Sequence, residues 1–157
     1  MSAIELFDPE FSFNPKFTYI TQVHFDELDA MQMLHNSRFA AHVERAVIAF
    51  YHEKGRTWEQ DPAGNPDQFH VVKDFRIEFL SPVSSLGPMR VDIWVERLGT
   101  TSCVYGFHCA SQDGKIPYAR GTRAIIKIDP TTKQPAPWTE YFREAHRELV
   151  KDLPAMP

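Results

Sequence analysis

The chain contains 157 residues, 43% of them apolar, which is enough to bury one hydrophobic core and fits a single domain. Its 17 Lys and Arg residues against 21 Asp and Glu residues give a net charge of −4, so the basic surface of a nucleic-acid-binding protein is not expected. No apolar run approaches the roughly 18 residues needed to span a membrane, and the acidic first residues lack the pattern of a signal peptide. We therefore expect a cytoplasmic protein with neither a nucleic-acid nor a membrane partner.

The first part of the chain predicts an arm, a strand and a loop. Residues 1–16 contain two prolines and are expected to form a loosely ordered N-terminal arm. Residues 17–24 are β-branched and aromatic, which predicts a strand. Residues 25–36 contain three acids and form the loop that leads into the next element.

A long amphipathic helix is predicted from about Ser37 to Lys54, because apolar residues there recur at spacings of three and four. Asn36 or Ser37 is the expected N-cap, and Gly55 is the expected residue after the C-terminus. Alanines keep this helix slim, so that a sheet can wrap around it. Its buried face should carry Phe39, Val43, Ala46 and Phe50.

The rest of the chain mostly alternates with a period of two, which is typical of strands with one buried face. Hairpin turns between successive strands favour an antiparallel sheet, so the predicted fold class is α+β with one central helix. In chain order we expect a loop (56–68), strands around 75–79, 91–95 and 103–109, hairpin turns at 98–101 and 112–115, a last strand (117–129) and a charged helix (roughly 140–150). The strands should contribute Phe75, Ile77, Phe79, Val91, Ile93 and Val95 to the core.

Three kinds of chemistry are disfavoured by the motifs. Cys103 and Cys109 share one strand face about 20 Å apart, taking ~3.4 Å per residue, so they cannot pair and are expected to be buried thiols. The seven histidines show no metal-ligand spacing, so no metal site is expected. No Gly-x-Ser-x-Gly segment is present, which argues against an α/β-hydrolase.

The loop before the helix carries the most informative residues. Asp29 is the acid nearest to the helix start, and His35 and Asn36 follow it directly before the helix. A carboxylate supplies a base or a nucleophile, and a helix N-terminus offers free N–H groups and a partial positive charge. Together they can attack a carbonyl and hold the developing oxyanion.

Each of these residues also has a purely structural interpretation. Asp29 could simply stabilise the turn or cap the helix, and Asp26 is its rival for a catalytic role. Asp26 and Glu27 are expected to be solvated loop acids. His35 is either a general acid or substrate contact or an ordinary residue that fixes the loop. Glu44, in the helix, is expected to be a hydrogen-bonded structural residue rather than a second catalytic acid.

Several segments together resemble the hot-dog fold thioesterases, specifically the 4-hydroxybenzoyl-CoA thioesterase-like family, over residues 17–138. Asp29-Ala-Met-Gln-Met-Leu-His-Asn36 looks like the family's Asp-x-x-Gly loop that ends in Asn. Phe39-Ala-Ala-His-Val-Glu-Arg-Ala46 is similar to the family's aromatic-x-x-x-x-Glu helix. The resemblance continues in Phe79-Leu-Ser-Pro-Val83, Val95-Glu-Arg-Leu-Gly-Thr-Thr-Ser102 and Ala119-Arg-Gly-Thr122.

The resemblance implies a hot-dog fold, in which an antiparallel sheet of five or six strands wraps around the long central helix. It places the domain at 17–138, between the arm (1–16) and a C-terminal helix and tail (139–157). Two chains would form a homodimer, or further a homotetramer, with acyl-CoA at their interface and with no cofactor. Asp29 would act as nucleophile or general base, and the N–H of Asn36 would bind the oxyanion.

The chain departs from the family pattern at two neighbouring positions. Gln32 replaces the usual Gly, and Met33 replaces a residue that is often His. Gln32 is therefore expected to narrow or reshape the thioester mouth. The further residues that the resemblance places near the substrate are Glu44 and, beside the CoA nucleotide, Arg97, Thr100, Thr101 and Ser102, where Arg97 would meet a phosphate.

The expected function is an acyl-CoA thioesterase acting on a small or fatty acyl group carried by CoA or by acyl carrier protein. A thioester is an activated carbonyl, so one carboxylate and one oxyanion donor can suffice. The alternative is a non-catalytic hot-dog protein that binds acyl thioesters, for which the departures at Gln32 and Met33 leave room. A hot-dog dehydratase or hydratase ranks lower, because the Asp-x-Asn-x-x-His run expected of one is missing.

Overall fold

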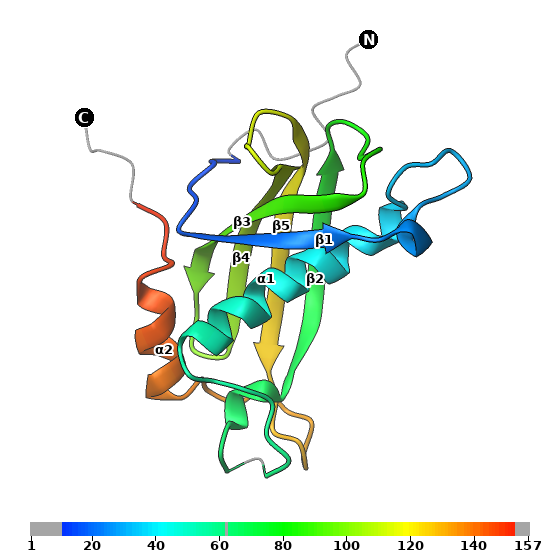
Figure 1. Cartoon of the computed structure of the whole chain (residues 1–157). Coiled ribbons are helices and arrows are strands. Elements are labelled where there is room, and N and C mark those ends of the chain that lie inside the picture. Colours follow the sequence, from blue (N-terminus) through cyan, green and yellow to red (C-terminus); the bar gives the residue numbers. More distant parts are fainter. Residues whose placement is uncertain (1–10, 62, 153–157) are drawn as a thin grey trace, which may run out of the picture.

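The computed structural model describes residues 11–61 and 63–152. Its strands form one antiparallel sheet in the order β1-β3-β4-β5-β2, crossed by a long helix (Figure 1). The predicted α+β class is confirmed, with five strands. The strands are β1 (Phe17–Val23), β2 (His70–Phe79), β3 (Gly87–Leu98), β4 (Ser102–Ser111) and β5 (Pro117–Lys127), the helices are α1 (Phe39–Glu53) and α2 (Glu140–Arg147), and 3-10 turns cover Phe25–Glu27, Asn36–Arg38 and Pro66–Gln68.

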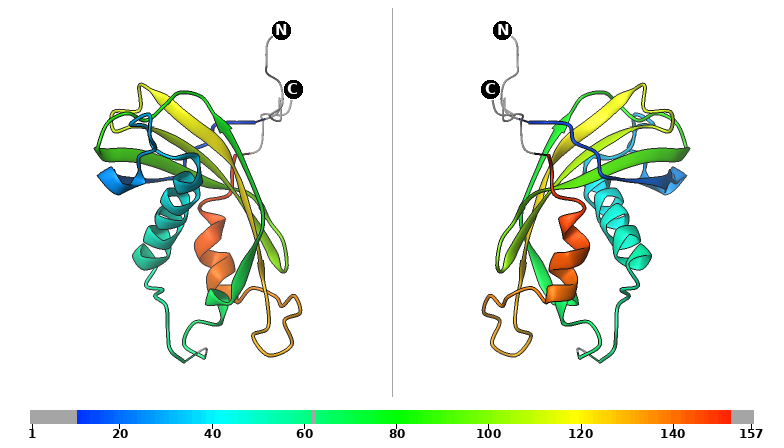
Figure 2. Two further views of the ribbon diagram at one scale, coloured as in Figure 1. Left: turned by 90° about the vertical axis from the view of Figure 1, so that its right-hand side faces the viewer. Right: turned by 90° about the vertical axis from the view of Figure 1, so that its left-hand side faces the viewer.

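Helix α1 lies on the concave side of the curved sheet, where α2 lies beside it (Figure 2). The helix face predicted from the spacing of apolar residues is confirmed, because Val43, Ala46 and Phe50 are fully buried and Phe39 is nearly so. The Phe50 ring meets Phe17 of β1 at a centroid distance of 5.5 Å. Burial of this apolar stripe ties α1 to the sheet and fixes where its N-terminus lies.

The two ends of α1 differ in how well they were predicted. At the start, neither Asn36 nor Ser37 is the N-cap: His35 holds this place before the 3-10 turn, and its ring Nδ1 accepts the N–H of Ser37 at 3.1 Å. At the end, Gly55 follows the helix as predicted, with a φ of 77° that favours glycine. Its N–H donates to the carbonyl of His52, as in a Schellman motif.

The predicted core residues are confirmed on the central strand β3, whereas the prediction for Phe79 on the edge strand β2 is wrong. Val91, Ile93 and Val95 of β3 are fully buried, while Phe75 and Ile77 of β2 pack partly against the core. Phe79 was expected to be buried and is instead 51% exposed. Strand β2 is an edge strand, so its end is covered from one side only.

The outer face of the sheet is more covered than alternation alone predicts. Trp94 alternates with the core residues of β3 and is nevertheless fully buried, because Phe11 and Phe13 pack on its ring at centroid distances of 5.7 and 5.9 Å. Trp94 also lies over Gly106, where a Cβ would come within 2.3 Å of the ring. The described part of the predicted arm, 11–16, is therefore packed rather than loose; residues 1–10 lie outside the described residues.

Helix α2 closes the end of the sheet opposite to the loop of Asp29. It begins as predicted at Thr139, whose side chain accepts the N–H of Phe142. The two cysteines are free and buried, as expected, and burial raises the pKa of each thiol to about 12. Within 11–61 and 63–152, no helix combines the length and the apolar character needed to cross a membrane.

Candidate functional site

The loop between β1 and α1 closes on itself like a small hairpin. Leu28 and Leu34 form an isolated antiparallel bridge, and the N–H of Asp29 donates to the carbonyl of Met33 at 2.7 Å. The N–H of Gln32 returns to the carbonyl of Asp29 at 3.0 Å. These hydrogen bonds hold Asp29 in a defined place instead of on a loose loop.

Only one oxygen of the Asp29 carboxylate is used to build the turn. Its Oδ1 accepts the N–H groups of Met31 at 2.8 Å and Met33 at 3.2 Å. The structural interpretation of Asp29 is therefore correct as far as this oxygen goes. Its Oδ2 receives no hydrogen bond from residues 11–61 or 63–152, and the side chain is half-buried. An oriented carboxylate with one free oxygen is available for chemistry.

Gln32 adopts a backbone conformation that explains why a glycine belongs at its position. Its φ is 62°, in the left-handed region, which side chains with a Cβ rarely enter. The residue is exposed and does not line the hollow beside Asp29. Gln32 in place of glycine therefore adds backbone strain, although the turn keeps the conformation that glycine would favour.

The start of the helix offers one backbone donor that no other group uses. The N–H of Ser37 is taken by the His35 ring, and the N–H of Arg38 donates to the carbonyl of His35. The N–H of Asn36 makes no hydrogen bond within the described part of the chain. It lies at the positive end of the helical segment, where a developing negative charge is stabilised.

Asp29 and Asn36 line one hollow, together with Met33. Its volume is about 340 Å³, which falls within the range of small-molecule sites. Among the described residues, its walls are apolar apart from the side chains of Asp29, Asn36 and Ser81, and Asp29 alone is charged. The other lining residues are Leu34, Phe39, Phe79, Leu80, Pro82 and Val83.

His35 lies on a different side of the loop. Its Nδ1 is 2.8 Å from the Ser37 hydroxyl, and the residue lines a separate hollow of about 260 Å³ that also borders Asp26 and Glu27. The structure therefore does not bring His35 to the hollow of Asp29. Its local contacts are those of a residue that fixes the helix start, and a direct catalytic role stays a prediction.

The remaining predicted binding residues lie away from Asp29 within one chain. Glu44 is half-exposed on the solvent side of α1 and pairs with Arg123 at 3.4 Å. Arg97 and the turn residues Thr100, Thr101 and Ser102 lie at the end of β3 opposite to the loop, because Gly87 at the other end pairs with Val23. Their contact with substrate stays a prediction that one chain alone does not satisfy.

Glu27 is the site residue that the sequence misassigned. It was expected to be a solvated acid, yet it is 5% exposed, and its carboxylate lies 2.8 Å from Nε2 of His42. The signal was His42 itself, which stands three residues after Phe39 on the apolar face of the helix. A buried polar side chain needs a partner, and the nearest preceding acids are in this loop.

A second polar network fills the opposite end of the core. The hydroxyl of Tyr51 lies 2.9 Å from that of Tyr105, which lies 2.7 Å from Nε2 of His146. Burial raises the pKa of both tyrosines and lowers the pKa of His146 to about 4. Nδ1 of His146 also lies 2.8 Å from the carbonyl of Phe142. The hydrogen-bonded network of Tyr51, Tyr105 and His146 is therefore neutral and structural.

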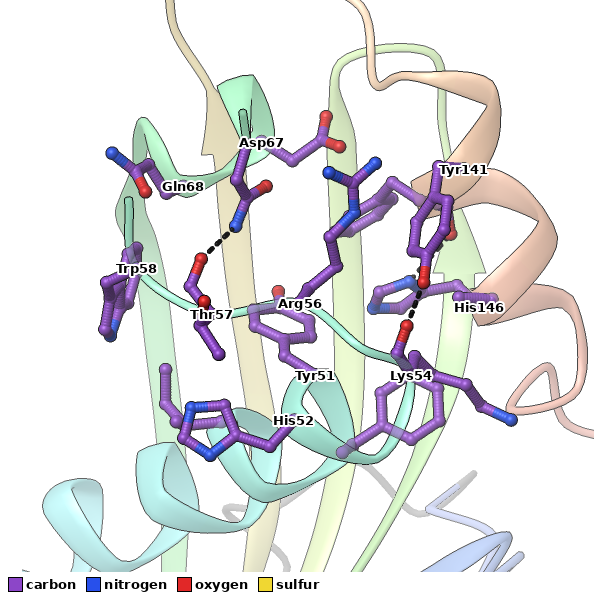
Figure 3. Close-up of a pocket in the computed structure, with 15 residues that line it drawn as sticks. Tyr51, His52, Lys54, Arg56, Thr57, Trp58, Asp67, Gln68, Tyr141 and His146 are labelled. Atoms are coloured by element: carbon purple, nitrogen blue, oxygen red, sulfur yellow. Dashed lines mark hydrogen bonds between the residues drawn. The ribbon is translucent and has the colours of Figure 1, made fainter. Parts of the chain in front are cut away.

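A small pocket lies beside this network (Figure 3). Its polar residues bind one another: the Tyr141 hydroxyl donates to the Lys54 carbonyl, and the Arg56 guanidinium lies 3.8 Å from the centre of the Tyr141 ring. The free volume is about 30 Å³, which is room for a water molecule and not for a thioester. Within the described residues, no group of three or more His, Cys, Asp or Glu is placed to hold a metal.

Comparison with known proteins gives the family. Residues 23–146 match the Thioesterase-like superfamily, whereas no curated protein matches the chain. The fold is similar to the 1,4-dihydroxy-2-naphthoyl-CoA thioesterase of Synechocystis (TM-score 0.74, 14% identity, 85% of this chain and 96% of that one). It is also similar to a Thermus thermophilus thioesterase in complex with coenzyme A and Zn (TM-score 0.69, 22% identity, 87% and 95%).

A third structure, the 1,4-dihydroxy-2-naphthoyl-CoA (DHNA-CoA) thioesterase of Staphylococcus aureus, shares 19% identity at a TM-score of 0.71 and covers 84% of this chain and 87% of its own. At such identities the likeness concerns the fold, and the match over 23–146 concerns the family. This chain therefore belongs to the thioesterase-like superfamily and shares the hot-dog fold of the thioesterase structures that it resembles.

Proposed function

We propose that the protein hydrolyses acyl-CoA thioesters at the hollow beside Asp29. The observation that carries this proposal is that two residues, each with an unused polar group, line one hollow. Among the described residues, neither the second carboxylate oxygen of Asp29 nor the backbone N–H of Asn36 has a hydrogen-bond partner, and both residues line the same hollow. A base and an oxyanion donor are the two groups that thioester hydrolysis requires.

The reaction would follow from the chemistry of these two groups. The thioester carbonyl oxygen accepts the N–H of Asn36, which stabilises the negative charge as the carbon becomes tetrahedral. Asp29 either takes a proton from the attacking water or attacks the carbon itself, and water then releases the acyl group from its carboxylate. In both routes the C–S bond breaks and the CoA sulfur leaves as a thiolate, which is then protonated.

The walls of the hollow favour an uncharged acyl group. Met33, Phe39 and Val83 offer apolar surface, and Asp29 is the one charged residue among the described residues that line it. A carboxylated acyl group would be repelled by Asp29 and would find no cation there. We therefore propose an apolar acyl substrate, small or fatty, on CoA or on acyl carrier protein.

The functional unit would be a homodimer, or a homotetramer built from dimers. The sheet leaves β2 as an open edge whose Val71 and Val72 are each 48% exposed. An open apolar edge is a template for strand pairing. A second chain would also be placed to bring Arg97 and the turn 99–102 toward a bound CoA. The cytoplasmic location expected from the sequence stays a prediction.

The alternative is a protein of the same fold that binds acyl thioesters without turnover. Two features favour this alternative: the backbone strain at Gln32, and Met33 at a position where the family often has His. Both residues stand close to the proposed base, Asp29. We expect purified protein to release free thiol from at least one uncharged aliphatic or aromatic acyl-CoA, and much more slowly from succinyl-CoA. Tight acyl-CoA binding by calorimetry without thiol release would identify the binding protein instead.

A further inference from the structure

Glu27 is enclosed and held at three points. Its Oε1 lies 2.8 Å from Nε2 of His42, and its Oε2 accepts the N–H of His24 at 2.8 Å. Its backbone carbonyl accepts the N–H of His35 at 2.9 Å. With 5% exposure, this acid contributes through its hydrogen bonds and not through contact with solvent.

The network extends from the loop into two elements of the core. His42 is fully buried in α1, and its Nδ1 lies 2.7 Å from the hydroxyl of Thr21 in β1, which is 2% exposed. Thr21, His42 and Glu27 thus join strand, helix and loop by two hydrogen bonds. A fully satisfied buried network of this kind fixes one arrangement of the elements it connects.

The charges around His42 indicate its protonation state. Burial lowers its pKa below the usual value, and the charge of Glu27 opposes this shift. Arg45, whose Nη1 is 3.9 Å from the Glu27 carboxylate, and His24 lower it further. A neutral ring donates Nε2–H to Glu27 and accepts the Thr21 hydroxyl at Nδ1, which satisfies every group.

Both parts of the proposed site are tied to Glu27. Asp29 follows Glu27 by two residues, and the backbone carbonyl of Glu27 accepts the N–H of His35, the residue directly before Asn36. The bridge between Leu28 and Leu34 closes the loop next to this point. A shift of Glu27 would therefore change the separation between the Asp29 carboxylate and the Asn36 N–H.

We propose that Glu27 and His42 are positioning residues, whose buried hydrogen bond clamps the loop to α1 and sets the geometry between Asp29 and Asn36. This inference rests on the function proposed above. Neither residue lines the hollow of Asp29, so they act through the groups that do. A displacement of about 1 Å can cost a hundredfold in rate.

A nucleophilic role for Thr21 is the competing interpretation, because hydroxyl, imidazole and carboxylate follow one another as in a catalytic triad. The burial of Thr21 and His42 argues against it, since a substrate carbonyl has no access to a hydroxyl that is 2% exposed. The hollow of about 340 Å³ is lined by Asp29 and does not reach Thr21.

The test is a double-mutant cycle on hydrolysis of the best acyl-CoA, with kcat, KM and melting temperature measured for E27Q, H42Q and the double variant. We expect each single variant to lower kcat about tenfold to a hundredfold, with KM changed by less than about threefold. The double variant should lose about as much as one single variant, because the pair acts as a unit. Activity is assayed well below the melting temperature.

D26N is the matched control, because Asp26 is the exposed neighbour of Glu27, and it should lower kcat far less than E27Q does. If D29N abolishes turnover while folded E27Q keeps the wild-type kcat, the positioning role is overturned and the proposed function stands. If D29N itself remains active, Asp29 is not the catalytic acid of the proposed function. T21V, which removes only the hydroxyl on His42, provides the test if E27Q does not fold: it should lower kcat, and an unchanged kcat overturns the inference.

Discussion

Glu27 and Asp29 show how two acids on one short loop acquire different tasks. Glu27 is 5% exposed, and both of its carboxylate oxygens are occupied. Asp29 is half-buried, and one of its oxygens accepts the N–H groups of Met31 and Met33, while the other has no hydrogen-bond partner within residues 11–61 and 63–152. Environment rather than residue type separates a structural carboxylate from one that can do chemistry.

The buried side chain of His146 makes the stability of the protein depend on pH. Burial lowers its pKa to about 4 from a usual value of 6.5, so the unfolded chain binds more protons than the folded one between these values. Stability is therefore complete above about pH 6.5 and is lost as the pH falls toward 4. Burial lowers the pKa values of His42, His70 and His108 in the same direction.

Urea unfolding at pH 7 and pH 5 measures this effect. The wild type should lose about 2 kcal/mol of unfolding free energy between these pH values through His146 alone. His146→Gln is less stable overall, but its stability should depend less on pH over the same range. An equal pH dependence in both proteins would show that His146 is not held neutral in the folded state.

At the scale of elements, the two edges of the sheet differ in chemistry. Strand β2 exposes Val71, Val72 and Phe79 along its edge. Strand β1, at the other edge, exposes mainly polar residues such as Thr18 and Gln22. Apolar edges left open invite pairing, whereas polar edges resist it. The proposed dimer is therefore expected to form through β2.

Val72→Lys should weaken this dimer, because it places a charge on the edge that a second chain would cover. Light scattering at micromolar concentration should give about twice the 18.1 kDa of one chain for the wild type and a smaller mass for Val72→Lys. Gln22→Lys, on the opposite edge, is the control and should stay dimeric. A wild-type monomer, or a dimer disrupted only by Gln22→Lys, would contradict pairing through β2.

At the scale of the whole molecule, the parts that could be predicted are those set by local periodicity. The apolar spacing of α1 placed Val43 and Phe50 in the core, and Gly55 marked the end of the helix. Alternation placed Val91 and Ile93 of β3 on the inner face. Each depends on residues within a few positions of one another, which is the range that a pattern contains.

The parts that could not be predicted depend on contacts between distant segments. Trp94 is buried because residues 11–16 cross the outer face of the sheet, and Phe79 is exposed because β2 lies at an edge. Glu27 is buried because His42 of the next element reaches it. The placement of Arg97 far from Asp29 likewise follows from strand order, which alternation does not determine.

The proposed catalysis depends most on Asp29, and the hydrolysis rate of Asp29→Asn with the best acyl-CoA tests this role most directly. This change keeps the size of the side chain and removes its charge, so folding should be intact and kcat should fall by at least about a hundredfold, the scale for losing a positioned base. Asp26→Asn, three residues earlier, should have a much smaller effect. Near-full turnover by Asp29→Asn, with loss of activity in Asp26→Asn or Glu44→Gln, would contradict the assignment of the catalytic acid.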